Sequence, residues 1–420
     1  MQRYESYKSS GLAWLGEVPS HWGLKKSKFL WREREDRSLL GDEQLLSVSQ
    51  YSGVVPRVED SRSDSLEDYK RCEPNDLVIN IMLAWMSGLG VSKYSGIVSP
   101  AYCVYSQLEN HNPSYFDYLY RTPQYLAEFA RRSKGIVPSR WRMYTEDFGQ
   151  ILSLLPPREE QDRIVAFLDQ KTAEIDAAIA KKERLIELLE EQRHTLISRA
   201  VTYGLNPDVA LQENNCKWLG TTPLHWKIQK IKYCSKIFRG KFTHRPRNDP
   251  RLYDGPYPFI QTGDVARAGK FITEFKQTLN ERGLRVSTLI PKGTVVLTIA
   301  ANVGDISILG FDACFPDSVV GFLPDSELER DYFYLALSVM KRQFMVSSIQ
   351  NTQMNLNVDR IGSNSIAIPP LPEQRAIIKW ADEITGFSEA AKTKLTDEIC
   401  ALRELKSTLV ANVVTGNLKI

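Results

Sequence analysis

A short basic segment, residues 239–247, carries side chains well suited to bind a polyanion. It reads Arg-Gly-Lys-Phe-Thr-His-Arg-Pro-Arg, so cationic side chains alternate with aromatic rings and with the turn formers Gly and Pro. Guanidinium and ammonium groups bind phosphate oxygens, and such a loop suits a nucleic-acid backbone. The candidate phosphate contacts are Arg239, Lys241, Arg245 and Arg247. A basic loop that only faces solvent is the alternative.

Two further segments, which lie just past a predicted helix in each half of the chain, are rich in Arg, Lys, Gln and Asn. These side chains can read the edges of base pairs in the major groove. A Gln-Thr pair after a predicted strand offers similar amide and hydroxyl groups. The candidates are Arg131, Arg132, Lys134, Arg140 and Arg142 in the first half, and Gln261, Thr262, Gln350, Asn351 and Gln353 in the second. Ordinary polar loops are the alternative.

The charge of the chain is unevenly distributed, although the net charge is only +3. Residues 216–300 contain 16 Lys/Arg and 5 Asp/Glu, whereas residues 301–370 contain 4 and 8. Residues 121–142 hold six basic side chains and one acidic one. Concentrated positive charge is typical of a nucleic-acid partner, and a solvated basic face is the alternative.

Motifs for catalysis are missing from the sequence. The run 263–270 has one residue too many for a phosphate-binding loop and lacks the Ser/Thr that should follow its lysine. Neither Pro-Pro pair has the flanking residues of a methyltransferase loop, and the six cysteines form no C-x-x-C pair. His21 and His225 lie in repeated tryptophan motifs, where a structural role is expected. We therefore expect a binding protein without catalytic residues, metal or cofactor.

The bulk composition is that of an ordinary soluble protein. The chain has 420 residues, 42% of them hydrophobic and 25% charged, which allows two to four domains. No apolar run approaches the roughly 18 residues that a membrane helix needs, and the first residues lack the apolar core of a signal peptide. A cytoplasmic location is expected.

An internal repeat organises the chain. Trp-Leu-Gly-x-x-Pro-x-His-Trp occurs at residues 14–22 and again at 218–226, with six identities at matched spacing. Pro-Pro-x-x-Glu-Gln occurs at 156–161 and again at 369–374. Each unit thus has an entry motif, a variable body and a long terminal segment.

The terminal segments are predicted to be long helices. Apolar residues recur in sevens with flanking threes and fours, as in a coiled coil, and Pro-Pro suits a helix start. Because both segments carry a matching stripe, we expect an intramolecular antiparallel pair with the bodies at its ends. Two helices that each pack on their own body are the alternative. Lys182 and Gln192 fall on or near the stripe, so the seam is imperfect.

The bodies are predicted to be mixed α/β. Strand-like runs occur at residues 77–81, 97–104, 295–299 and 305–309, and helix candidates at 114–129 and 330–345. The fold class is therefore α+β, with two α/β recognition domains separated by the antiparallel helices and related by a pseudo-twofold repeat. The expected domains are 1–155, the first helix 156–204, the second body with its linker 205–368, and the second helix with its tail 369–420.

This arrangement of motifs resembles the specificity subunits of type I restriction–modification systems. The resemblance rests on the two tryptophan motifs, the two Pro-Pro-x-x-Glu-Gln motifs and the long helices, and it spans essentially the whole chain. The first copy has Arg-Glu between Pro-Pro and Glu-Gln where the second has Leu-Pro. In this family each body reads one half of a bipartite, asymmetric DNA site, and the helices space the bodies and supply docking surface.

The resemblance also implies partners. Two methyltransferase subunits would dock on the chain, restriction subunits would join them where present, and double-stranded DNA would be the ligand. S-adenosylmethionine, ATP and magnesium would belong to those partners, and this chain would bind none of them. The alternative is a phage or plasmid adaptor that uses the same scaffold to modulate a host restriction enzyme without reading DNA.

Overall fold

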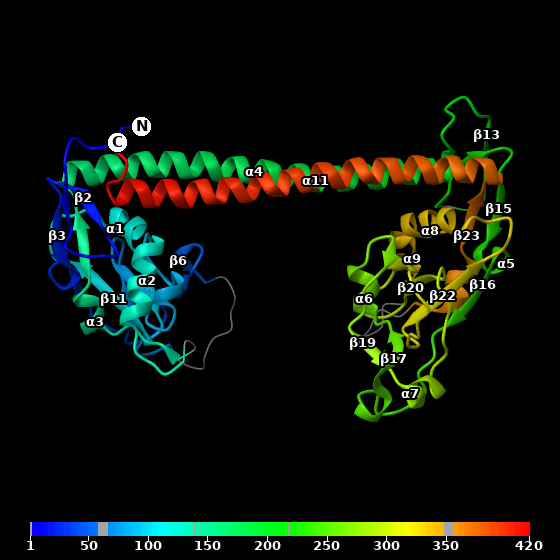
Figure 1. Cartoon of the computed structure of the whole chain (residues 1–420), viewed down its shortest axis with the longest axis horizontal. Coiled ribbons are helices and arrows are strands. Elements are labelled where there is room, and N and C mark those ends of the chain that lie inside the picture. Colours follow the sequence, from blue (N-terminus) through cyan, green and yellow to red (C-terminus); the bar gives the residue numbers. More distant parts are fainter. Residues whose placement is uncertain (1, 58–65, 138–139, 215, 217, 348–355) are drawn as a thin grey trace. The chain divides into compact units, whose positions relative to one another are not determined.

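The computed structural model describes residues 2–57, 66–137, 140–214, 216, 218–347 and 356–420. Its contacts group the chain into two units, residues 1–183 with 396–420 and residues 184–395. Each unit combines one α/β body with part of the long helices α4 (Arg158–Tyr203) and α11 (Leu371–Val414), which Figure 1 labels. The mixed α+β class is as predicted. The division at residues 155, 204 and 368 stays a prediction.

The first body is built on an antiparallel sheet in the order β4-β11-β8-β9. These strands are β4 (Trp31–Glu33), β8 (Leu77–Asn80), β9 (Leu89–Val91) and β11 (Tyr102–Gln107). All of β8 is buried, as expected for an apolar run between two neighbouring strands. Two-stranded pairs surround this sheet: β1 (Tyr7–Ser9) with β2 (Glu17–Pro19), β3 (Gly23–Lys26) with β12 (Leu152–Leu155), β5 (Leu46–Ser49) with β6 (Gly53–Pro56), and β7 (Lys70–Cys72) with β10 (Gly96–Val98). The helices of this body are α1 (Pro113–Tyr120), α2 (Pro123–Arg132), α3 (Thr145–Gly149) and the 3-10 turns η1 (Ser27–Phe29) and η2 (Ala84–Met86).

The second body has a sheet in the order β16-β22-β20-β21-β18, with β18 parallel to β21 and the other pairs antiparallel. Its strands are β16 (Ser235–Arg239), β18 (Phe271–Ile272), β20 (Val295–Thr298), β21 (Ile306–Leu309) and β22 (Val319–Pro324). The two-stranded pairs are β13 (Leu211–Glu213) with β14 (Thr221–Pro223), β15 (Lys227–Lys230) with β23 (Ser365–Ile368), and β17 (Tyr253–Phe259) with β19 (Gln277–Leu279). The helices are α5 (Ile231–Cys234), α6 (Thr262–Arg267), α7 (Glu281–Arg285), α8 (Arg330–Val339), α9 (Lys341–Ser347), α10 (Val358–Ser363) and the turn η4 (Pro250–Leu252).

The topology of the two bodies agrees with the sequence repeat. In each sheet a long strand, β11 or β22, is flanked by a first strand and by a buried strand that continues into a hairpin. A short antiparallel pair, β3 with β12 and β15 with β23, leads into the long helix in both copies. The predicted internal repeat is therefore present in the fold.

Two expected features differ from the structure. The run 97–104 contains parts of two strands, β10 and β11, because the backbone turns at Ser99, whose carbonyl accepts the Tyr102 N–H. The predicted helix 114–129 is two helices that part before Pro123, which brings no N–H to the helical ladder. The predicted helix 330–345 is likewise divided into α8 and α9 at Met340.

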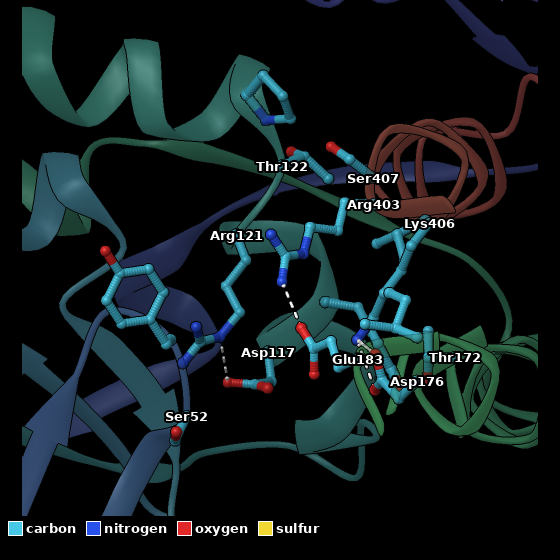
Figure 2. Close-up of a pocket in the computed structure, with 15 residues that line it drawn as sticks. Ser52, Asp117, Arg121, Thr122, Thr172, Asp176, Glu183, Arg403, Lys406 and Ser407 are labelled. Atoms are coloured by element: carbon cyan, nitrogen blue, oxygen red, sulfur yellow. Dashed lines mark hydrogen bonds and ion pairs between the residues drawn. The ribbon is translucent and has the colours of Figure 1, made fainter. Parts of the chain in front are cut away.

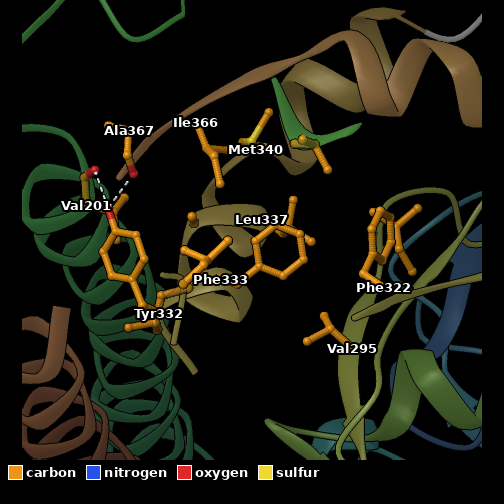
Figure 3. Close-up of a cluster of buried hydrophobic side chains, with 14 of the residues drawn as sticks. Val201, Val295, Phe322, Tyr332, Phe333, Leu337, Met340, Ile366 and Ala367 are labelled. Carbon is orange, nitrogen blue, oxygen red and sulfur yellow. Dashed lines mark hydrogen bonds between the residues drawn. The ribbon is translucent and has the colours of Figure 1, made fainter. Parts of the chain in front are cut away.

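Each body is anchored on a long helix by one buried tyrosine of its core. In the second unit the Tyr332 hydroxyl donates to the Ala367 carbonyl at 2.9 Å and to the Val201 carbonyl, near the end of α4, at 3.3 Å (Figure 3). In the first unit Tyr115 donates to the Val414 carbonyl of α11 at 3.0 Å. The last carbonyls of a helix lack partners within it, so these tyrosines satisfy one such group in each copy.

Candidate nucleic-acid interface

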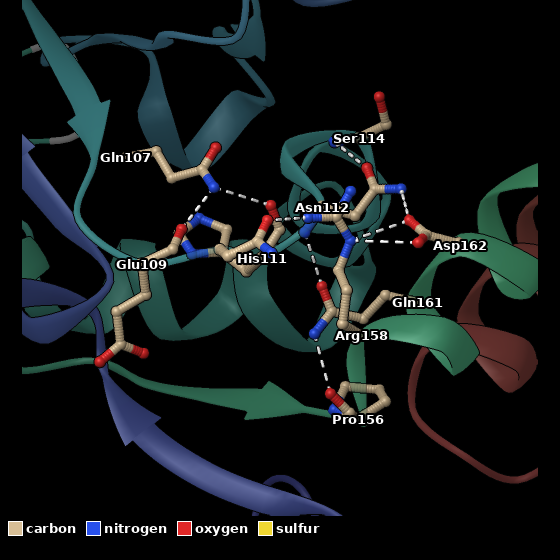
Figure 4. Close-up of polar contacts among 10 residues, drawn as sticks. Gln107, Glu109, His111, Asn112, Ser114, Pro156, Arg158, Gln161 and Asp162 are labelled. Carbon is tan, nitrogen blue, oxygen red and sulfur yellow. Dashed lines mark hydrogen bonds and ion pairs between the residues drawn. The ribbon is translucent and has the colours of Figure 1, made fainter.

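Two side chains in the first turn of α4 hold the first body on its helix. Glu160 accepts hydrogen bonds from the Tyr4 hydroxyl and from His21, whose Nε2 lies 2.8 Å away. Gln161 accepts the Asn112 backbone N–H and donates to the Pro156 carbonyl, both at 2.8 Å (Figure 4). The Glu-Gln pair of one motif therefore binds the histidine of the other motif and the loop before α1.

We call this contact between a Glu-Gln pair and its body a joint. The second copy has the same kind of joint, formed by its own residues. Glu373 lies 2.6 Å from His225 Nε2 and accepts the Trp226 indole N–H at 3.0 Å. Gln374 accepts the Glu329 backbone N–H and donates to the Pro369 carbonyl, both at 2.8 Å. Both histidines thus lie in the joints, where the sequence predicted a structural role for them.

The long helices pair in antiparallel orientation within each unit. In the first unit Asp176 pairs with Lys406 at 2.7 Å and Glu183 with Arg403 at 3.0 Å, so residue numbers rise along α4 as they fall along α11. In the second unit Glu190 pairs with Lys392. The alternative, in which each helix packs only on its own body, is wrong.

The seam between the helices differs slightly from the predicted stripe. Lys182 lies on it, half-buried and paired with Glu398, but Gln192 is exposed. Leu185 and Leu405, two apolar residues of the heptad segments, are 45% and 55% exposed. They lie on the outer side because the observed seam follows alternate steps of three and four residues through positions 182, 186 and 189.

A cavity of about 650 Å³ lies in the first unit between α1, the β5–β6 turn and the helix pair (Figure 2). Besides the two ion pairs between α4 and α11, Asp117 faces Arg121 at 3.3 Å. Arg121 also bonds the Gln50 and Leu89 carbonyls and passes beside Gly53, where a Cβ would lie 2.8 Å from its Nη2. These opposite charges neutralise one another. The cavity therefore lacks the net positive charge that would attract phosphate, and we interpret its ion pairs as structural.

The basic segment of the first body contains both paired and unpaired cations. Arg131 and Arg132 bind the buried carboxylate of Glu128, and Lys134 lies 2.9 Å from Asp147. Burial opposes ionisation of Glu128, but the hydrogen bonds from the two arginines outweigh it and lower the pKa of this carboxyl.

Two predicted arginines of this segment have no carboxylate partner among the residues that the structure describes. Arg140 is exposed, and Arg142 donates only to the neighbouring Trp141 carbonyl, at 2.9 Å. The Arg142 backbone pairs with that of Lys134, so the two strands of this loop hold the cations close together. Arg140 and Arg142 are thus the better phosphate candidates in the first body.

In the second body, the arginines of residues 239–247 gather around one acidic residue. Arg247 pairs with the Asp317 carboxylate, Arg245 lies 3.8 Å from it, and Arg239 donates to the Asp317 carbonyl. Lys241 is exposed and has no side-chain partner in the described part of the chain. The loop is therefore less positive than its sequence alone indicates, and Lys241 keeps the freest charge of the four.

The structure adds two cations that the sequence analysis did not single out. Arg282 and Arg285 are exposed on α7 without a carboxylate partner among the described residues. Backbone contacts place α7 beside the basic loop, since Thr243 N–H donates to the Val286 carbonyl at 3.0 Å. Their signal in the sequence was the positive charge of residues 216–300, which carries no information on which cations share a surface.

The remaining predicted contacts have other surroundings or lie outside the described residues. Gln261 caps α6, where its side chain accepts an N–H of the first turn while Asp264 accepts the Gln261 N–H at 2.8 Å. Its amide also donates to Gln277 at 3.0 Å, and Thr262 is half-buried as the first residue of that helix. Gln350, Asn351 and Gln353 lie outside the described residues. Base contact by any of these side chains stays a prediction.

The described residues contain no group of three or more His, Cys, Asp or Glu side chains placed to hold a metal ion. They also contain no helix that is both long enough and apolar enough to cross a membrane.

Comparison with known proteins gives a match in the second unit. Residues 223–400, which hold the second body and most of α11, match the type I restriction modification DNA specificity domain. This match and the relatives below support a specificity subunit of a type I restriction–modification system. Among the relatives is the EcoBI specificity subunit of Escherichia coli, 19% identical over 324 residues, which are 74% of this chain and 67% of that protein. Another is the putative MjaX specificity subunit of Methanocaldococcus jannaschii, 23% identical over 63% of this chain and 59% of that protein.

Solved structures share the fold at low sequence identity. A chain from a study of complex assembly and conformational transition in a type I restriction–modification system superposes with a TM-score of 0.71 at 16% identity, over 96% of this chain and 99% of that one. The HsdS subunit from Thermoanaerobacter tengcongensis gives a TM-score of 0.52 at 16% identity, over 98% and 100%. The similarity of fold therefore includes both bodies and both long helices.

Proposed function

We propose that this chain is a sequence-specific DNA-binding subunit that reads a bipartite, asymmetric site with one half for each body. The observation that carries the proposal is the duplication. Two bodies whose sheets share a four-strand core order sit on equivalent Glu-Gln joints, yet their exposed cations come from different segments, around Arg140 in one and Arg282 in the other. Equal scaffolds with unequal polar surfaces suit two different half-sites.

The chain acts, in this proposal, without chemistry of its own and directs methyltransferase and, where present, restriction subunits to the site. Those partners would bring S-adenosylmethionine, ATP and magnesium. The adaptor that does not read DNA is less favoured, because the match to a DNA specificity domain covers the second body and most of α11. A cytoplasmic location fits a subunit whose ligand is DNA.

Co-expression with a type I methyltransferase subunit from the same host tests the proposal. Sequencing of modified bases in the host genome should give one motif with two defined halves and an undefined spacer, and the motif should vanish without this chain. Methylation that does not depend on the chain, or that follows a single continuous motif, would contradict it. Purified chain alone should show no methyl transfer, nuclease activity or ATP hydrolysis.

A further inference from the structure

The joint of the first unit is covered by a tyrosine. The ring of Tyr4 lies 5.5 Å from that of His21 and 5.8 Å from that of Trp22, and its hydroxyl donates to Glu160. Tyr4 is 8% exposed, and it leaves only 8% of the Glu160 side chain open to solvent. Nearby, Tyr7 donates to the Gly416 carbonyl at 3.0 Å.

The second unit has related surroundings with one difference. The Trp226 indole N–H donates to Glu373, whereas the Trp22 indole N–H has no partner among the described residues. By the offsets of the repeat, Glu373 corresponds to Glu160 and His225 to His21. Gly204 takes the structural place of Gly416, although the offset of the repeat aligns Gly416 with Tyr203. Both glycines follow the end of a long helix with φ near +80°, and a Cβ on either would lie 3.1–3.2 Å from the tryptophan of the joint. All three counterparts in the second unit line a cavity of about 280 Å³.

No described side chain takes the place of Tyr4 in that cavity. The Glu373 side chain is 43% exposed, against 8% for Glu160. Tyr203 and Leu205 in the cavity wall are 39% and 42% exposed. A carboxylate acceptor beside open apolar surface is what remains when a covering phenol is taken away.

We propose that this cavity binds a tyrosine side chain from an extended segment of the methyltransferase partner. The phenol O–H would donate to Glu373, an acceptor that is charged and therefore strong, while the ring would pack on Pro223 and Ile377. The cavity is lined by Pro223, His225 and Glu373 of the repeated motifs, together with residues of the long helices and of the linker after α4. No strand of the five-stranded sheet of the second body contributes to it, so we expect binding there to be independent of the DNA target. The cavity chemistry rests on geometry, whereas the identity of the partner rests on the proposed function.

A peptide with the sequence of residues 2–9 of this chain is the probe for the cavity chemistry. Isothermal titration into the full-length chain should show saturable binding, and replacing the first tyrosine of the peptide with phenylalanine should weaken it about tenfold. Ala376 lines the cavity and is exposed, so Ala376→Trp should fill the space and abolish binding. Lys379→Trp, also exposed on α11, is the matched control and should bind as the wild type does.

Absence of saturable binding, or equal binding by the Ala376→Trp chain, would overturn the proposal. The phenylalanine peptide is tested on the wild-type protein. It therefore reports the role of the tyrosine hydroxyl even if the Ala376→Trp chain is unstable. A peptide pair of equal affinity would overturn the assigned hydrogen bond to Glu373.

The identity of the partner is tested with the methyltransferase subunit itself. Ala376→Trp should raise the dissociation constant of the complex at least tenfold, and Lys379→Trp should leave it unchanged. Equal affinity of both variants would overturn the methyltransferase as occupant while the proposed function stands. If the wild-type chain binds no methyltransferase, the proposed function fails, and the peptide experiment still decides the cavity chemistry.

Discussion

His111 lies at the base of the first body with 2% of its surface exposed, and neither ring nitrogen has a hydrogen-bond partner among the described residues. Its ring packs edge-on against Trp31 and Phe116 at 4.7 and 4.8 Å. Burial lowers the pKa of His111 to about 4. The second body has the buried Leu328 at the equivalent position, so a histidine is not required by this packing.

This lowered pKa predicts acid sensitivity of the first unit. As pH falls through about 6.5, the unfolded chain takes the proton first, because the folded pKa is lower. Stability should therefore be full above pH 6.5 and decline between pH 6.5 and 4, by on the order of 3 kcal/mol at most. Urea unfolding at pH 7.5, 5.5 and 4.5 should show that His111→Leu removes this decline. The exposed His194→Gln is the control, and an unchanged pH dependence in His111→Leu would contradict the prediction.

The unpaired cations of the second body are expected to contact phosphates. Combined substitution of Lys241, Arg282 and Arg285 by alanine should weaken DNA binding on all sequences and lower the salt slope, by about one unit for each contact. Arg375→Ala removes an exposed charge that is paired with Glu329 at the base of α11, and should leave the slope unchanged. The measurement is the DNA dissociation constant at several salt concentrations between about 50 and 200 mM, a range in which such affinities fall steeply. An unaltered slope in the triple variant would remove this surface from the interface.

At the scale of elements, the helix pair has a register that ties α4 to α11. The pairs Asp176–Lys406 and Glu183–Arg403 in one unit, and Glu190–Lys392 in the other, place Ala180 opposite residues near 402. An insertion in α4 alone would slide these partners apart by about one turn for four residues. Lengthening the helix pair without losing these contacts therefore needs insertions in both helices.

A matched insertion of four residues after Ala180 and four after Ala401 is expected to lengthen the undefined spacer of the DNA site by one or two base pairs. Four residues add about 6 Å of helix, and one base pair rises about 3.4 Å. Sequencing of modified bases should find both half-sites unchanged. Matched two-residue insertions should do worse, since they turn the apolar stripe by about 200°. An active four-residue variant with the original spacer would show that the helices do not set the distance.

At the scale of the whole molecule, the duplication predicts separable recognition. Each body has its own sheet, core and Glu-Gln joint, so residues 216–368 should be replaceable by the body of a relative. The methylated motif should change in one half and keep the other. The reciprocal exchange of residues 24–155 is the control and should change the opposite half. A motif altered in both halves by one exchange would contradict independent bodies.

Much of this organisation follows from the sequence by itself. The tryptophan and Pro-Pro-x-x-Glu-Gln motifs determined the repeat, because identities at fixed spacing are independent of any fold. The sevenfold spacing of apolar residues determined the long paired helices, because the period of a helix places such residues on one face. The missing motifs determined the expectation of a binding protein. The break at Pro123 was also within reach of the sequence, since proline rarely continues a helix.

Only the tertiary structure decided which charges are free and which joints are open. Asp317 is about 70 residues from the arginines that it binds, and α7, which carries Arg282, lies beside the segment of Lys241 through the backbone contact of Thr243 with Val286. Likewise, Tyr4 meets Glu160 across the fold, and its absence beside Glu373 appears only when the two joints are compared in space. The physical reason is that local periodicity fixes helices and strands, whereas the neutralisation of a charge or the filling of a cavity depends on which side chains the fold brings within a few ångströms.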